Sequence, residues 1–255
     1  MSRTLKVFED YETSNPPPID EQKRFWDGWN ASTRFEGELD AFMSRQREMA
    51  LLVAGEAGFK DARILDAGCG TGWLGNELLP FGRVWGTDLS PAAIAEGKRR
   101  HPGVELICGD FLEVDLKGPL DLVVMSDSLT HMHDQPGAVR RVAHLLRADG
   151  TYLLMTPNRD VWRRRSKLKP KGPGQIMAWP SLAAYRALLR DWFAIESVST
   201  IMPGGDRGML WWVENRRVRG AMGRLVGPER WRNILENAGY GRELVIVARR
   251  NNAPA

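Results

Sequence analysis

The chain has 255 residues, of which 43% are hydrophobic and 27% charged, and its net charge is +4. This length and composition suit one large α/β domain and exclude a disordered or fibrous chain. Two cysteines, Cys69 and Cys108, are too few for a disulfide framework or a zinc cluster. Because the N-terminus lacks an apolar leader and no segment reaches about eighteen apolar residues, we expect neither export nor a membrane span. A reducing, cytoplasmic compartment is therefore predicted.

Residues 1–55 are predicted to form an N-terminal extension with a lid helix. Phe25, Trp26 and Trp29 recur at helical spacing, so one face of this helix is aromatic. The aromatic face either packs onto the main domain or covers a ligand and excludes water from it. Arg34 follows the helix, and we expect its guanidinium to pair with a ligand carboxylate.

Residues 56–255 are predicted to form the main domain, with helical insertions at about 159–190 and 203–240. Short apolar segments separated by helical patterns or turns indicate βαβ repetition and a mostly parallel sheet, at 63–67, 83–87, 104–108, 120–125 and 151–156. Two further apolar segments, at 192–201 and 243–248, are expected to pair antiparallel at the sheet edge. The fold class is therefore α/β, with a doubly wound, mostly parallel sheet of seven strands.

The segment LDAGCGTG, residues 65–72, has the form of a turn at which the backbone approaches a nucleotide. Its glycines, Gly68, Gly70 and Gly72, follow a predicted strand directly. A dinucleotide fingerprint requires a third glycine where this chain has Trp73. The turn therefore fits a pyrophosphate poorly.

An acidic residue at each of three strand ends favours a ligand with positive charge. Asp66 precedes the glycine turn, where a carboxylate would repel phosphate but attract a cation. S-adenosylmethionine carries an ammonium and a sulfonium and no phosphate, and the helix after the turn could offer N–H groups to its carboxylate. Asp88, beside Leu89, could accept both ribose hydroxyls, and Asp110 and Phe111 could contact the adenine. We expect all five residues to bind this cofactor, together with the three glycines.

The motifs LDAGCGTG, GTDLS, CGDF, DLVVMSDSLTHMHD and LLRADGTYLLMTPN occur in order between residues 60 and 158. In this order the chain resembles a class I S-adenosylmethionine-dependent methyltransferase. The resemblance implies a Rossmann-like methyltransferase fold and a cofactor contact at Ser126, after the fourth strand. The LTHMHD segment is similar to that of the ubiquinone-biosynthesis type O-methyltransferases, but Thr130 stands where they usually have glutamate.

Methyl transfer to a hydroxyl would require a base, and four histidines are candidates. His131 and His133 lie in the loop after the fourth strand, close to where the methyl group would point, and imidazole has a suitable pKa. His101 is in a helix-ending context and His144 lies on a predicted helix, so both are expected to be structural. The alternative is that alignment alone drives the reaction, with neither loop histidine essential.

Asp127 and Asp134 lie in the same loop as the candidate histidines. They could order the loop or hold a divalent ion. Because no clear third ligand is present, no metal is predicted.

Basic residues are concentrated in the second half of the chain. Between residues 158 and 232, sixteen Lys and Arg stand against six Asp and Glu. The segments RRRSKLKPKGPG and RGMLWWVENRRVRGAMGRL combine arginines with aromatic and apolar residues. They could contact a membrane surface or a lipid-tailed substrate, an anionic acceptor such as a sugar nucleotide, or RNA, or they could form a solvated helical subdomain.

Three functions remain open from the sequence. The leading one is O-methylation of a small-molecule hydroxyl, on a lipid, quinone-like, glycosyl or natural-product intermediate, by a monomer or homodimer. The second is RNA methylation through the basic insertions, which the low net charge and the absence of an RNA-binding motif disfavour. The third is S-adenosylmethionine binding without catalysis.

Overall fold

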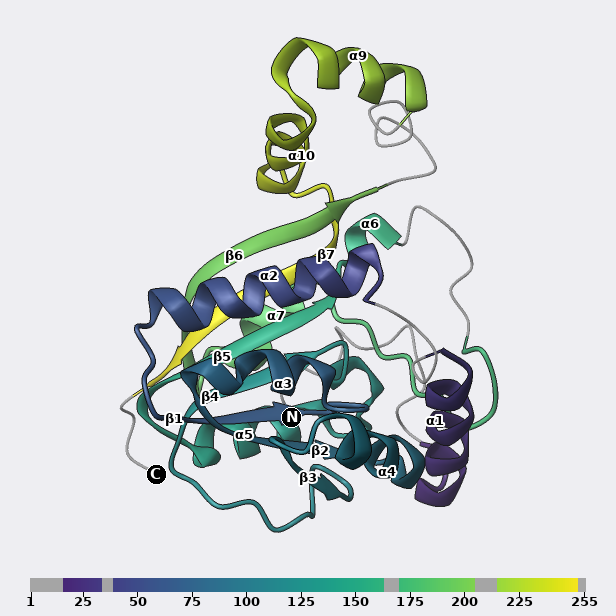
Figure 1. The fold of residues 1–255 in the computed structure, drawn as a ribbon, viewed down its shortest axis with the longest axis vertical. Helices are drawn as coiled ribbons and strands as arrows, with labels where there is room; N and C mark the ends of the chain where they lie inside the picture. Colours follow the sequence, from purple (N-terminus) through teal and green to yellow (C-terminus); the bar gives the residue numbers. More distant parts are fainter. Residues whose placement is uncertain (1–15, 34–38, 163–169, 205–214, 252–255) are drawn as a thin grey trace.

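The computed structural model describes residues 16–33, 39–162, 170–204 and 215–251. Within these residues seven strands form a sheet in the order β3-β2-β1-β4-β5-β7-β6 (Figure 1). The strands are β1 (Ala62–Ala67), β2 (Gly82–Asp88), β3 (Glu105–Cys108), β4 (Leu120–Ser126), β5 (Leu146–Pro157), β6 (Phe193–Pro203) and β7 (Gly241–Arg250). β1 to β5 pair in parallel, whereas β7 runs antiparallel to both β5 and β6. The predicted mostly parallel sheet with an antiparallel pair at one end is confirmed.

Helices cover both faces of this sheet. In the described residues these are α1 (Ile19–Thr33), α2 (Ala41–Glu56), α3 (Trp73–Leu78), α4 (Pro91–Arg100), α5 (Gln135–Leu145), α6 (Arg159–Trp162), α7 (Leu182–Leu189), α9 (Arg216–Val226) and α10 (Pro228–Asn237), with short 3-10 turns at Leu79–Phe81 and Leu129–His131. One core cluster packs α2, α3 and α4 against the sheet, and the other packs α5 and α7 against the opposite face. The architecture is therefore a three-layer α/β/α sandwich.

β4 is the central strand of the core. Leu122 and Val124 belong to one core cluster and Val123 and Met125 to the other, and all four side chains are buried. Because successive side chains of a strand point to opposite faces, a strand covered on both sides reads as an unbroken apolar run. The run LVVM in the sequence has this cause.

β5 begins five residues before the expected start at 151. Its first residue, Leu146, pairs with Leu120, and the register then shifts so that Leu122 pairs with Thr151. Asp149, in the intervening turn, has a positive φ of 57°. The strand was predicted from its apolar segment at 151–156 alone, whereas pairing with β4 occurs on both sides of this irregularity.

The two helices of the predicted extension are attached to the domain in different ways. α2 packs into the core through Ala50, Val53 and Ala54. α1 lies beside α4, where the Asp27 carboxylate accepts hydrogen bonds from the Ser90 hydroxyl and, at 3.1 Å, from the backbone N–H of Ala92. α2 is thus part of the main body, and α1 is held against its surface.

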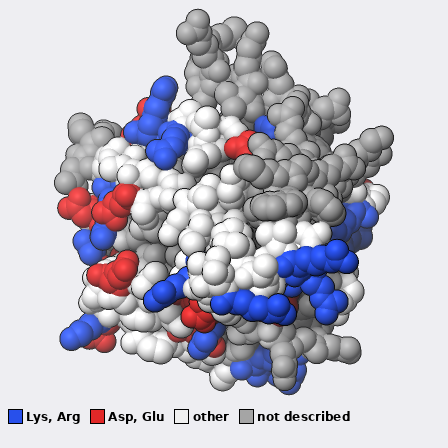
Figure 2. All heavy atoms as spheres, turned by 90° about the horizontal axis from the view of Figure 1, so that it is seen from above, with Lys and Arg blue, Asp and Glu red and all other residues white. Residues whose placement is uncertain are grey.

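α9 and α10 form a helical hairpin that projects beyond β6, away from the rest of the domain (Figure 1). Figure 2 looks down on this end of the molecule and shows several Lys and Arg side chains around an uncharged area. No helix in the described ranges is both long and apolar enough to cross a membrane. The predicted insertion at 159–190 contains α7, which packs into the core, whereas the basic run at 163–169 lies outside the described residues.

Candidate functional site

A cavity of about 540 Å³ opens at the carboxyl ends of β1, β2 and β4. One side, the glycine-turn half, is formed by Asp66, Gly68, Cys69, Gly70, Thr71, Asp88, Leu89, Asp110 and Phe111. The other side, the aromatic half, is formed by Phe42, Gln46, Asp127, His131, Trp162, Trp179 and Arg242. Trp26, Trp29 and Asn30 of α1 line the cavity as well. This position follows the general rule that open α/β sheets bind ligands beyond the carboxyl ends of their strands.

The glycine turn is held by backbone hydrogen bonds to β2. The N–H groups of Gly68 and Cys69 both donate to the carbonyl of Thr87, at 2.7 and 3.0 Å. Gly68 has a φ of +79°, and a Cβ at this position would lie 2.2 Å from Cβ of Ser128. Glycine is therefore required here both by the backbone conformation and by the loop after β4.

Gly72 is the one predicted cofactor residue in the described chain that does not line the cavity. It precedes the six-residue helix α3 with a φ of 76°, and a Cβ there would lie 3.0 Å from the Leu106 side chain. The contact that glycine permits at this position is therefore with β3. Its predicted part in cofactor binding stays a prediction.

Asp66 places a carboxylate in the wall of the cavity. The residue is 1% exposed, and its Oδ2 has no hydrogen-bond partner in the described chain. Burial, together with the neighbouring Asp88, raises the pKa of Asp66 to about 7, although a backbone hydrogen bond from Gly75 opposes the shift. An unpartnered carboxylate oxygen beside a cavity is stabilised by a ligand that brings a positive charge.

Asp88, the last residue of β2, is oriented by the backbone on both of its oxygens. Oδ2 accepts a hydrogen bond from the N–H of Gly70 and Oδ1 one from the N–H of Ser90, each at 2.8 Å. Burial raises the pKa of Asp88 despite these bonds. A carboxylate has about four lone-pair sites, so this fixed group can still accept bonds from a ligand.

Leu89, Asp110 and Phe111 border the glycine-turn half at the ends of β2 and β3. Asp110 accepts a hydrogen bond at Oδ1 from the N–H of Leu112, at 2.9 Å. Phe111 is buried in the core, and the guanidinium of Arg141 lies 5.6 Å from the centre of its ring. Phe111 therefore belongs both to the core and to the cavity wall.

These groups fit S-adenosylmethionine. The unpartnered oxygen of Asp66 suits its ammonium, the oriented carboxylate of Asp88 suits paired hydroxyls, and the walls at Leu89 and Phe111 suit a purine ring. Gly70 lines the cavity with its backbone, and a Cβ at this position would have only Oδ1 of Asn30 within 4 Å, at 3.5 Å.

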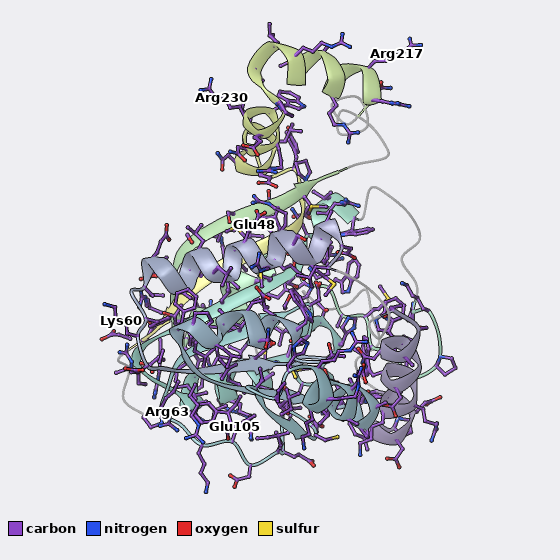
Figure 3. The ribbon with its side chains drawn as sticks, in the orientation of Figure 1. Glu48, Lys60, Arg63, Glu105, Arg217 and Arg230 are labelled. Atoms are coloured by element: carbon purple, nitrogen blue, oxygen red, sulfur yellow. The ribbon has the colours of Figure 1, made fainter. Side chains whose placement is uncertain are left out.

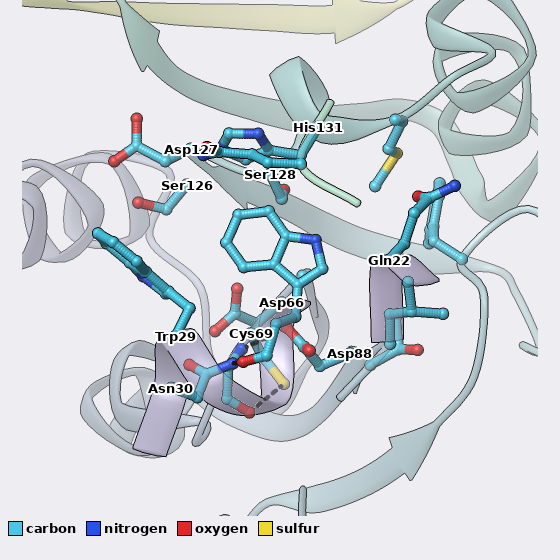
Figure 4. Close-up of a pocket in the computed structure, with 18 of the residues that line it drawn as sticks. Gln22, Trp29, Asn30, Asp66, Cys69, Asp88, Ser126, Asp127, Ser128 and His131 are labelled. Carbon is cyan, nitrogen blue, oxygen red and sulfur yellow. Dashed lines mark hydrogen bonds between the residues drawn. The ribbon is translucent and has the colours of Figure 1, made fainter. Parts of the chain in front are cut away.

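His131 lies across the cavity from Asp66 and Asp88 (Figure 4). Its Nδ1 is 2.6 Å from the carbonyl oxygen of Ile176, and because that oxygen can only accept, Nδ1 carries the proton. Nε2 then has a free lone pair. Burial lowers the pKa of His131 to about 4, so the imidazole is neutral at physiological pH. The ring also contacts Trp26, with 4.7 Å between ring centres.

The remaining predicted site residues have different surroundings. Ser126 and His133 both line the cavity, and His133 is exposed. Arg34 lies outside the described residues. His144 is exposed on α5 and packs against Trp192, while His101 follows the last residue of α4, as expected for structural histidines.

A buried polar network that sequence reasoning missed closes the aromatic half. The Gln46 amide donates to Oδ2 of Asp127 at 2.9 Å and to Oε1 of Glu243 at 2.8 Å. Burial raises the pKa of Glu243 well above its usual range, and the nearby Asp127 adds to this effect. Asp127 thus orders the loop after β4. The available signal was Glu243 itself, an acidic residue directly before the apolar run LVIVA of β7.

The segment 170–179 contributes to the cavity lining, through Lys171, Gln175, Met177 and Trp179. The N–H of Ala178 donates to the carbonyl of Thr130 at 2.9 Å, and the amide of Gln135 donates to the carbonyl of Ala178 at 2.8 Å. Thr130, at the position where the resembled enzymes have glutamate, is buried. Asp134 caps α5 by accepting from the N–H of Gly137, and no group of three or more potential metal ligands occurs in the described part of the chain.

Known proteins share both the fold and parts of the sequence. The family model described as "Methyltransferase domain" matches residues 39–241. A probable S-adenosylmethionine-dependent methyltransferase of Mycolicibacterium smegmatis is 35% identical over 98 residues, which are 38% of each protein. A ubiquinone biosynthesis O-methyltransferase of Rhodopseudomonas palustris is 31% identical over 122 residues, 46% of this chain and 47% of that protein. The match thus spans less than half the length of either relative.

Solved structures show the same fold at low sequence identity. The N-methyltransferase NodS of Bradyrhizobium japonicum, solved with S-adenosyl-L-homocysteine, superposes with a TM-score of 0.59 at 14% identity, covering 92% of this chain and all of that one. The family match covers most of the chain and includes the glycine turn, Asp88 and the loop after β4. The chain therefore belongs to the methyltransferase domain family, as a class I S-adenosylmethionine-dependent member.

Proposed function

We propose that the protein transfers a methyl group from S-adenosylmethionine to the hydroxyl of a small molecule with a flat, mainly apolar body. The observation that carries this proposal is the continuity of the cavity, in which cofactor-type groups at Asp66 and Asp88 face aromatic walls and a neutral imidazole at His131. A cavity of about 540 Å³ is in the usual range for small-molecule sites. The O-methyltransferase among the relatives supports a hydroxyl acceptor.

The glycine-turn half would hold the cofactor. We assign its ammonium to Asp66, its ribose hydroxyls to Asp88, its adenine to Asp110, Phe111 and Leu89, and a further contact to Ser126. When bound, S-adenosylmethionine supplies a methyl group already activated on a sulfonium. The chain then has to align the acceptor with that methyl group, exclude water and receive the proton of the hydroxyl.

The aromatic half would hold the acceptor. Trp162 and Trp179 contact each other edge to face, with 5.8 Å between ring centres, and the indole N–H of Trp162 donates to the carbonyl of Arg242 at 2.8 Å. Rings fixed in this way offer a flat, rigid surface to a planar acceptor. Trp26 and Trp29 of α1 would cover the bound molecules and exclude water, which is the role expected of a lid helix.

His131 would orient the acceptor hydroxyl through Nε2. A base with a pKa near 4 holds a proton too weakly to remove it from a hydroxyl before methyl transfer. We therefore propose that Nε2 accepts a hydrogen bond from the hydroxyl. It would take the proton of the hydroxyl as the new oxygen–carbon bond forms and the carbon–sulfur bond breaks. His133, which is exposed, is the alternative proton acceptor.

The test is an acceptor screen with S-adenosylmethionine carrying a labelled methyl group, using phenols, catechols and quinols beside amines, sugars and RNA. We expect label in an aromatic hydroxyl, and His131→Ala should lower kcat about 100-fold with little change in S-adenosylhomocysteine affinity. His144→Ala, an exposed histidine away from the cavity, is the matched control. Labelling of RNA would favour the RNA methyltransferase, and no labelled product from any acceptor would favour binding without catalysis.

The two free cysteines agree with action in a reducing, cytoplasmic compartment.

A further inference from the structure

The α9–α10 hairpin is anchored at one end and exposed at the other. Leu235 and Glu236 of α10 are buried, and the Glu236 carboxylate pairs with the guanidinium of Arg45 on α2 at 2.6 Å. The same carboxylate accepts a hydrogen bond from the N–H of Met202 at 3.0 Å. α9, by contrast, contains no buried residue. The hairpin is thus fixed at its base and presents α9 to its surroundings.

α9 has an apolar side on which Leu225 is exposed and Val218 and Met222 are half-buried. Val218, Met222 and Leu225 are separated by four and three residues, which places them on one side of the helix. The Leu225 side chain is 77% exposed. On α10, Ile234 is also exposed, at 50%. Exposed apolar residues on a single helical face mark an interaction site more often than scattered ones do.

The rest of α9 is basic. Its four arginines are Arg216, Arg217, Arg219 and Arg224, and the helix contains no Asp or Glu. The labelled Arg217 and Arg230 side chains point outward from the hairpin, away from the domain (Figure 3). A helix with arginines on one side and apolar residues on the other is complementary to a lipid surface, in which anionic headgroups lie above an apolar interior.

We propose that α9 docks the protein on an anionic membrane surface, with Val218, Met222 and Leu225 entering the headgroup region and the arginines contacting lipid phosphates. The lipid surface is favoured over RNA because RNA would bind the arginines but leave the apolar face exposed. This docking is independent of the acceptor proposed above, since the hairpin contributes no residue to the cavity.

The test measures sedimentation of the full-length protein with vesicles of phosphatidylcholine alone or mixed with phosphatidylglycerol. We expect strong binding only to the anionic vesicles, weakened by salt. Leu225→Glu should reduce the binding constant about tenfold, because an apolar contact with the membrane is lost. Arg217→Gln and Arg224→Gln should each reduce it about fivefold.

Matched variants control for general effects of the substitutions. Leu52→Glu changes a leucine of α2 that is 49% exposed, and Arg140→Gln changes an exposed arginine of α5; both should bind like the unaltered protein. Equal binding to neutral and anionic vesicles, or unchanged binding of Leu225→Glu, would overturn the proposal. So would RNA binding that depends on Arg217 and Arg224 but not on Leu225, in the absence of vesicle binding.

Discussion

The two halves of the cavity are built by different means. In the glycine-turn half the backbone fixes the geometry: N–H groups of Gly70 and Ser90 orient Asp88, and the turn itself is bonded to Thr87. In the aromatic half the geometry depends on side chains, through the Gln46 amide and the edge-to-face rings of Trp162 and Trp179. A backbone frame accepts few substitutions, whereas a wall of side chains can change while the fold persists. This difference fits the proposed roles of the two halves, one for the cofactor and the other for an acceptor.

The first prediction breaks the backbone frame at Gly68. Gly68→Ala should lower the free energy of unfolding by about 3 kcal/mol, because the new Cβ combines a left-handed conformation with a clash against Ser128. Urea unfolding measures the change. Gly58→Ala is the control, since Gly58 has a φ of +65° but no atom within 4 Å, and it should cost only about 1 kcal/mol. Equal losses in the two variants would show that Ser128 does not constrain the turn.

The second prediction removes the carboxylate that the frame holds. Asp88→Ala should weaken S-adenosylhomocysteine binding about 100-fold in calorimetry, because charge-assisted hydrogen bonds to the ligand are lost. Asp121→Ala removes another carboxylate that accepts a backbone N–H, from Arg63 at 2.8 Å, but Asp121 does not line the cavity. It should lower stability and leave affinity unchanged. If Asp88→Ala and Asp121→Ala lowered S-adenosylhomocysteine affinity equally, the loss in Asp88→Ala would be due to a general effect on folding.

The sequence could predict the glycine-turn half because its parts follow one another at successive strand ends. Once a parallel sheet was inferred, Asp66, Asp88 and Asp110 had to meet at the same edge. The aromatic half offered no such rule: Gln46 bonds to residues 81 and 197 positions away, and the Ile176 carbonyl that fixes His131 lies in an irregular segment. Such contacts depend on tertiary packing, which a local pattern does not encode.

The third prediction tests the electrostatics of the glycine-turn half through pH. Protonated Asp66 cannot attract an ammonium, so S-adenosylhomocysteine affinity should rise roughly twentyfold between pH 5.5 and 7.5, as follows from a pKa near 7. Asp66→Asn should bind more weakly at pH 7.5 and show a much smaller rise. Calorimetry at several pH values measures both.

The same pKa has an opposite consequence for the ligand-free fold. Since the pKa of Asp66 is higher in the folded than in the unfolded protein, its proton stabilises the fold below about pH 4, and this stabilisation is lost as the pH rises through about 7. Asp66→Asn should therefore be more stable than the unaltered protein at pH 7.5 in the absence of ligand. A destabilised Asp66→Asn variant at that pH would contradict the assignment of a buried carboxylate with one unpartnered oxygen.

The smallest expected effect concerns a contact between two side chains that line the cavity. The Lys171 ammonium lies 4.0 Å from the centre of the Trp29 ring, which joins the segment at 170–179 to α1. Lys171→Ala should lower the free energy of unfolding by about 0.5 kcal/mol, the usual size of an exposed cation–π contact, while Lys171→Arg should retain it. Lys60→Ala, at an exposed lysine after α2, is the control and should change nothing. A loss for Lys171→Arg as large as for Lys171→Ala would show that the contact is not electrostatic. If Lys171→Ala lowered the free energy of unfolding by much more than about 1 kcal/mol, the contact would be stronger than an exposed cation–π pair. A single side chain would then stabilise the aromatic half as strongly as the backbone stabilises the glycine turn.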